Sequence, residues 1–66
     1  MALVELAERG SSGLVVRLFW DRERKQAVLR YRDRLTGDAF VADVPNDRAL
    51  VAFEHPNVYR PAAAVA

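Results

Sequence analysis

Cysteine is absent from this 66-residue sequence, and histidine occurs once, at His55. The chain can therefore form no disulfide, and a single imidazole cannot assemble the tetrahedral set of ligands that a structural zinc ion needs. Small natural domains usually rely on such cross-links, on a metal or on a partner subunit. We therefore expect no metal and no other cofactor, and we expect stability to come from core packing or from association with another chain.

An excess of charge of either sign is also missing. Ten Lys and Arg residues against nine Asp and Glu residues leave a net charge of +1, which provides no long-range field to attract nucleic acid or an anionic membrane. No apolar run approaches the roughly 20 residues that a membrane helix needs, and the N-terminus carries Glu5 and Glu8 in place of the basic start of a targeting segment. We predict a cytoplasmic protein that does not contact membranes.

Hydrophobic residues, by contrast, make up 52% of the chain, which is above the average of folded proteins. A chain this short forms one domain and hides only about 60% of the surface that its unfolded form exposes. Residues 1–60 are predicted to make that domain. Residues 61–66 (PAAAVA) offer no large side chain for burial except Val65, and they are predicted to be a frayed tail.

Three segments alternate apolar and polar side chains with period two, which is typical of strands in a half-buried sheet. They are residues 14–20 (LVVRLFW), 27–34 (AVLRYRDR) and 38–44 (DAFVADV). A polar loop separates the first two, and Gly37, which adopts a positive φ at low cost, reverses the chain before the third. The pattern predicts an antiparallel meander.

The N-terminal segment 2–9 fits two structures. Its residues LVELAER before Gly10 can form a short helix with a glycine stop, or a further strand paired with residues 14–20. We favour the strand, because it continues the apolar face of the sheet. The favoured register pairs Val4 with Leu18, Leu6 with Val16 and Glu5 with Arg17.

A short helix is predicted after the last strand. Pro45 ends that strand, Asn46 or Asp47 can cap the helix, and residues 47–55 (DRALVAFEH) have helical spacing. Pro56 then prevents the helix from continuing. A helix this short is marginal alone, so it must dock on the sheet to exist.

The predicted fold is α+β: an antiparallel meander of three or four strands with one short C-terminal helix packed on one face. Ala49, Leu50 and Phe53 share one stripe of the helix by the i, i+3, i+4 rule, so Leu50 and Phe53 are expected to anchor it. The predicted core consists of Leu14, Val16, Leu18, Trp20, Leu29, Tyr31, Phe40, Val44, Leu50 and Phe53.

Basic residues concentrate between Arg17 and Arg34. Seven basic residues against three acidic ones give this hairpin a local charge of +4, and its arginines can bind phosphates while Phe19 stacks on unpaired bases. Nucleic-acid binding is therefore the alternative functional hypothesis. It would use Arg17, Arg22, Arg24, Arg30, Arg32 and Arg34. The competing interpretation is a solvated sheet face whose polar positions are filled by arginine.

Apolar residues on the predicted outer face support the preferred hypothesis. Phe19, Val28 and Val41 form a row across three strands in the expected register, and a contiguous apolar row on a solvent face is a candidate contact for a partner. We therefore prefer a non-enzymatic interaction module that forms a homo-oligomer or binds a protein partner through this face.

No constellation of catalytic residues is recognisable, so we predict that the protein is not an enzyme. There is no Ser/His/Asp arrangement that can be placed in one cleft, and no pair of carboxylates with apolar neighbours. Asp33 and Asp38 flank a turn and are expected to cap it. His55 stands at the end of the predicted helix, where a structural role is expected.

The segments LFWDR, TGDAF and VPNDRALVAFEHP, taken in that order, resemble small uncharacterised proteins from actinobacteria. The resemblance spans most of the chain and lies in the overall layout and in a helix that ends at His55 and Pro56. It implies no activity, and no residue role is transferred from it.

Overall fold

The computed structural model describes residues 2–61 and contains a four-stranded antiparallel sheet. The strands are β1 (Leu3–Ser11), β2 (Leu14–Asp21), β3 (Gln26–Asp33) and β4 (Ala39–Val44), and they lie side by side in sequence order. The predicted meander is confirmed. The N-terminal segment forms a strand, so its helical alternative is wrong.

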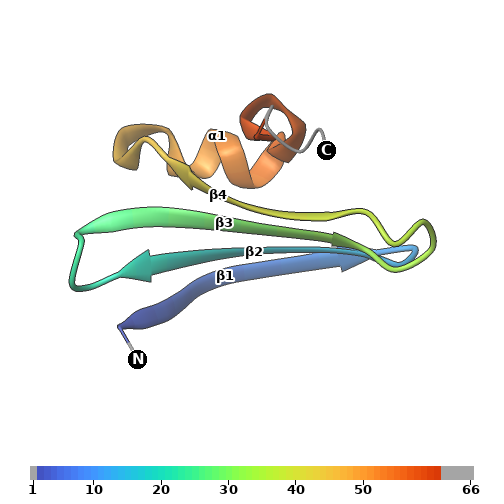
Figure 1. Ribbon diagram of the computed structural model, residues 1–66, viewed down its shortest axis with the longest axis horizontal. Coiled ribbons are helices and arrows are strands. Elements are labelled where there is room, and N and C mark those ends of the chain that lie inside the picture. The colour runs from blue at the N-terminus through green and yellow to red at the C-terminus, as the bar shows by residue number, and fades with distance from the viewer. Residues whose placement is uncertain (1, 62–66) are drawn as a thin grey trace.

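A helical segment follows β4 and lies on one side of the sheet (Figure 1). It begins with a 3-10 turn, η1 (Asn46–Arg48), continues as α1 (Ala49–Glu54) and ends with a second 3-10 turn, η2 (Pro56–Tyr59). Helix α1 contacts β2 and β3. We call the face of the sheet that α1 covers the inner face, and the opposite one the outer face.

Two turns meet at one end of the sheet (Figure 1). Ser12 and Gly13 both have positive φ, as a two-residue hairpin requires, and Gly37 has a positive φ in the turn between β3 and β4. The Arg34 amide donates a hydrogen bond of 2.8 Å to the Gly13 carbonyl and so joins the two turns. Asp33 Oδ1 accepts from the Leu35 amide at 2.9 Å, which confirms that Asp33 caps its turn.

The register of β1 differs from the expected one because the chain reverses at Ser12 and Gly13, which pairs Ser11 with Leu14, and because a bulge then interrupts the pairing. Between Glu5 and Ala7 the register shifts, so that Leu6 has no partner on β2. Glu5 then lies opposite Phe19, and Glu8 takes the place opposite Arg17 that was expected for Glu5. The three predicted pairs of β1 are therefore wrong. The turn at Ser12 and Gly13 displaces β1 by three residues from the expected register, and the bulge reduces this offset to two for Val4 and Glu5.

Asn46 does not cap the helix, and neither does Asp47, since no side chain makes a cap hydrogen bond at the start of η1 or α1. The Asn46 side chain instead accepts a hydrogen bond from the Ala27 amide at 2.8 Å and donates one to the Lys25 carbonyl at 2.9 Å. The predicted cap is wrong because the side-chain amide of Asn46 forms its hydrogen bonds with these two backbone groups and not with the start of the helix. Asn46 thereby links the end of β4 to the loop between β2 and β3.

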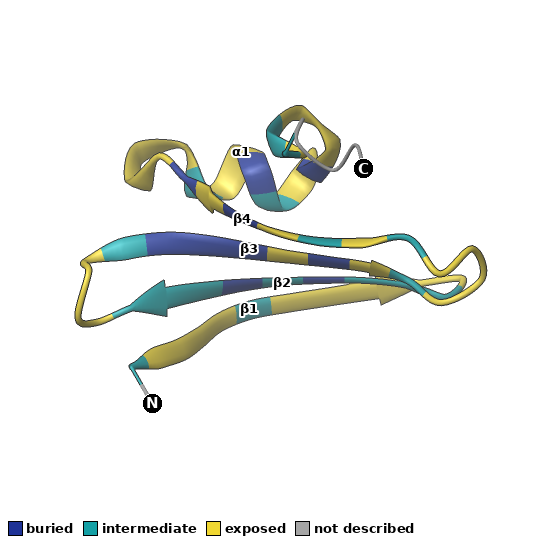
Figure 2. Ribbon diagram, viewed as in Figure 1, coloured by how far each residue is buried: buried dark blue, intermediate teal, exposed yellow. Residues whose placement is uncertain are grey.

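The core lies between the inner face and α1, and its centre is on β2 and β3 (Figure 2). Leu29, Val16 and Val44 are its largest fully buried side chains. Most predicted core residues belong to it, although Leu14, Phe40 and Phe53 are only partly buried and Trp20 is half-buried. Three further strand residues are buried that the predicted core omitted: Ala27 and Ala42, which the alternation places on the inner face, and Val28, which it places on the outer face.

Leu50 was expected in this core, but its side chain is 70% exposed. Ala52 takes that place and is fully buried. Residues 49 and 53 fit two helical stripes, one completed by Leu50 and the other by Ala52, and periodicity cannot choose between them. The small Ala52 lets the helix backbone come close to the sheet, and Leu50 is left outside.

The C-terminal part of the described chain covers one end of the core. Tyr31 and Phe40 lie opposite each other on β3 and β4 and stack with their ring centroids 4.9 Å apart. The guanidinium of Arg60 lies over both rings and makes a two-pronged ion pair with Asp38. Asp38 was expected to cap the turn, but its carboxylate binds Arg60 and anchors the segment after η2 instead. The predicted tail falls almost wholly on residues 62–66, outside the described residues.

Candidate functional site

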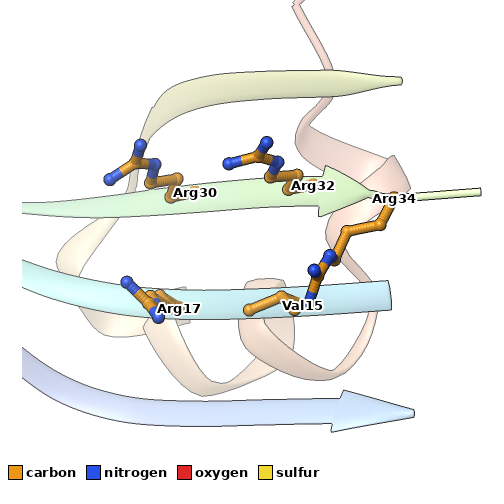
Figure 3. Close-up of a pocket in the computed structure, with 5 residues that line it drawn as sticks. All are labelled: Val15, Arg17, Arg30, Arg32 and Arg34. Carbon is orange, nitrogen blue, oxygen red and sulfur yellow. The ribbon is translucent and has the colours of Figure 1, made fainter. Parts of the chain in front are cut away.

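The candidate site is a hollow of about 200 Å³ on the outer face, which we call the arginine hollow. It lies where β2 and β3 run beside each other, with Arg17 opposite Arg30 and Val15 opposite Arg32. Because side chains alternate along a strand, these four residues share the outer face. Figure 3 shows Arg34 reaching from beyond the end of β3 towards Val15. The lining residues are Val15, Arg17, Arg30, Arg32 and Arg34.

Among the residues that the structure describes, Arg17 is the one arginine of the hollow with carboxylate partners. Its Nε donates to Glu8 at 3.0 Å, and Glu5 is 4.0 Å away. The bulge in β1 brings both carboxylates to this position. Their charge relieves the repulsion that Arg17 would otherwise feel from Arg30, its direct cross-strand neighbour.

The other three arginines of the hollow keep their full charge available. Arg30, Arg32 and Arg34 are exposed, and none of them forms an ion pair within residues 2–61. Guanidinium groups gathered at one place repel each other, and an anion relieves that repulsion. An arginine presents its donors in a planar fork that suits phosphate and carboxylate oxygens. The hollow is thus suited to bind an anionic group.

Arg24, also predicted as a binding residue, is committed to the fold. Its guanidinium binds Asp21 at 2.7 Å and Asp43 at 2.8 and 2.9 Å. These hydrogen bonds connect the loop after β2 to β4 across the sheet. Arg22 lies in the same loop, at the end of the sheet away from the hollow, and its amide donates to the Ala2 carbonyl.

The structure therefore gathers four of the six predicted arginines and leaves two elsewhere. Arg17, Arg30, Arg32 and Arg34 line the hollow, whereas Arg22 and Arg24 do not. Val15 was not predicted as a site residue. The signal that places it there is its alternation with Arg17, because residues two apart on a strand share a face.

The predicted apolar row is wrong at its middle and at one end. Val28 pairs with Phe19 as expected, but its other neighbour is Asp43, and Val41 lies opposite Arg30. Val28 is only 5% exposed, although it is on the outer face. Val41 is 59% exposed and Phe19 is half-buried. The register of β4 is offset by two residues from the expected one, so Phe19, Val28 and Val41 do not form a contiguous row.

The carboxylates around Arg24 make stability depend on pH. The hydrogen bond from the Arg24 side chain holds the pKa of Asp43 below its ordinary value of 3.8, and a hydrogen bond from the same side chain lowers the pKa of Asp21. A carboxyl with a lower pKa in the folded chain binds fewer protons when folded, so its stabilising effect is present above about pH 4 and is lost as the pH falls through the lowered pKa.

We therefore expect the melting temperature to fall between about pH 4 and pH 2, and Arg24→Met to make this fall shallower. Melting curves followed by circular dichroism at a series of pH values measure both. Arg48→Met, which removes one charge at an exposed position outside these ion pairs, is the matched control. If the melting temperatures of wild type and Arg24→Met fall equally steeply below about pH 4, the pH dependence does not come from the ion pairs of Arg24.

No group of three or more His, Asp or Glu side chains in residues 2–61 is arranged to hold a metal ion. Over the same range, no helix has the length and apolar character needed to cross a membrane. Comparison with known proteins finds no matching family model, no matching curated protein and no matching solved structure.

Proposed function

We propose that this protein is a non-enzymatic binding module that holds nucleic acid by its backbone phosphates in the arginine hollow. One observation carries the proposal: Arg30, Arg32 and Arg34 are exposed around a single hollow, and none forms an ion pair within the described chain. The remaining arginine of the hollow, Arg17, shares its charge with Glu8.

The spacing of these arginines suits a repeating anion. Alternate residues of a strand are about 6.8 Å apart, so Arg30 and Arg32 present two guanidinium groups at a regular interval along β3. A nucleic-acid backbone carries one charge for each nucleotide and can therefore contact successive arginines. The arginine fork also forms paired hydrogen bonds with phosphate oxygens.

The net charge of +1 limits the kind of binding that is expected. Without a long-range field, attraction depends on the few arginines that touch the phosphates. Affinity should then be moderate, and it should fall with salt according to the number of phosphates contacted.

The sequence favoured association through Phe19, Val28 and Val41. Val28, the central residue of this set, is buried and is not accessible to a partner. An apolar interface needs a contiguous exposed patch. Phe19 and Val41 are separated by Val28, Asp43 and the arginines in the register of the sheet. An acidic protein partner is therefore treated as an outcome of the test below.

The test measures the binding of fluorescein-labelled nucleic acids by anisotropy at 50 and 200 mM salt. With three or four phosphate contacts, the affinity of the wild type should fall over this range by about 20- to 50-fold for a single strand and by about 40- to 150-fold for a duplex. The double variant Arg30→Ala/Arg32→Ala should bind at least about ten-fold more weakly and should show a smaller salt dependence, because it releases fewer counterions.

Arg22→Ala/Arg48→Ala is the matched control, since it removes the same charge at two exposed arginines outside the hollow. It should bind nearly as well as the wild type. An affinity that does not change with salt, or an equal loss in both double variants, would overturn the proposal. Binding of polyglutamate as tight as that of nucleic acid would also overturn it, because an acidic protein would then be the better partner.

A further inference from the structure

Apolar side chains lie among the arginines of the outer face. Val15 lines the arginine hollow, and Val41 is 59% exposed directly beside Arg30. Phe19 is on the same face, two residues along β2 from Arg17, and is partly exposed. Binding of phosphates alone would leave these apolar side chains without a favourable contact.

Duplex and single-stranded nucleic acids differ in what they offer to such a surface. In a duplex the bases are stacked inside, and they are reached only by an element that enters a groove, such as a helix or a two-stranded ribbon. Within residues 2–61 the outer face carries no helix, and α1 covers the inner face (Figure 1). A flat sheet face would therefore meet only the backbone of a duplex, and Val15, Val41 and Phe19 would contact no base.

A single strand, in contrast, exposes both its phosphates and the flat faces of its bases. Sheet surfaces that bind single strands combine cationic residues for the backbone with aromatic and apolar side chains for the bases. The outer face has this combination. Arg30 and Arg32 follow one strand, and Val41 and Val15 flank them on the two neighbouring strands.

We infer that the arginine hollow takes single-stranded nucleic acid, with the phosphates along β3 and bases packed on Phe19, Val15 and Val41. This inference rests on the proposed function, and it adds that the bases contribute to binding. The contacts are with the faces of the bases, so little dependence on sequence is expected.

The experiment compares three forms of one labelled oligonucleotide: the single strand, the same strand annealed to its complement, and a strand of equal length in which every base is replaced by an abasic site. All three carry the same kind of backbone. We expect the single strand to bind at least about ten-fold more tightly than either of the others. Equal affinity for all three would overturn the inference and leave phosphate binding intact, whereas no binding to any of them would overturn the proposed function itself.

Two variants test the apolar contacts separately. Val41→Ser removes an exposed apolar side chain without changing charge, and Phe19→Leu keeps an apolar side chain next to Val28 but removes the aromatic ring. Phe19→Leu should weaken binding of the single strand by about five-fold or more, and Val41→Ser by a smaller factor, while both leave the abasic strand unaffected. Melting temperatures within a few degrees of the wild type establish that both variants are folded. An equal effect on the single and abasic strands would contradict base packing.

Discussion

Leu29→Ala should leave the protein largely unfolded or close to it at ordinary temperature. Leu29 is fully buried between Leu18 on β2 and Ala42 on β4. Truncating a buried leucine to alanine costs about 2–5 kcal/mol, because transfer energy is lost and a cavity remains. At about 0.05–0.15 kcal/mol per residue, a domain of this length has a total stability of only about 3–10 kcal/mol.

The measurement is thermal unfolding followed by far-ultraviolet circular dichroism. Because 1 kcal/mol shifts the melting temperature of a domain this small by about 4–8 °C, a decrease of at least about 10 °C is expected. Leu35→Ala is the matched control, since the same atoms are removed from a side chain that is 78% exposed. Melting temperatures that fall equally in both variants would contradict the placement of the core.

Phe53→Ala is expected to have the second largest effect, because Phe53 holds the helix on the sheet. Its ring packs on the core, and the guanidinium of Arg9 lies 5.5 Å from the ring centroid while donating to the Phe53 carbonyl at 2.9 Å. Helix α1 has only six residues and has no stability alone. Truncating a core phenylalanine to alanine costs about 3–5 kcal/mol of stability. Because Phe53 is partly exposed, we expect its truncation to cost about the lower of these values or less.

Amide hydrogen exchange measures this effect locally. The His55 amide, which donates to the Val51 carbonyl at 2.8 Å, should lose its protection in Phe53→Ala, and the melting temperature should fall by about 10 °C. Leu50→Ala, on the same helix, should change neither quantity appreciably, because Leu50 faces solvent. If Leu50→Ala removes protection as strongly as Phe53→Ala, then the face on which α1 docks has been assigned wrongly.

The strands were predictable because a sheet with one covered face needs side chains that alternate. The inner face of β2 follows this rule from Leu14 through Val16 to Leu18, and β3 follows it from Ala27 to Tyr31. Helix α1 was harder to predict. Six residues contain too few turns for periodicity to distinguish Leu50 from Ala52 as the residue that faces the sheet.

For the candidate site, the sequence could predict only which residues share the outer face. Alternation places Arg30 and Arg32 on the outer face, but it does not say which arginines carry ion pairs. Arg24 pairs with Asp43, nineteen residues away in sequence, and Arg17 pairs with Glu8 because the turn at Ser12 and Gly13 sets the register of β1 there. Such contacts depend on register, and register is set by bulges and turn lengths that leave a weak signal in the sequence.

The sequence by itself determined the antiparallel meander, the helix that follows it and the side of the sheet on which each arginine of β2 and β3 lies. These features depend on local alternation and on turn residues such as Gly37, whose effects reach only a few residues. The tertiary structure alone decided that Arg30, Arg32 and Arg34 are unpaired in the described chain and that Val28 is covered. Those properties depend on which side chains from distant segments come into contact, and local spacing does not contain that information.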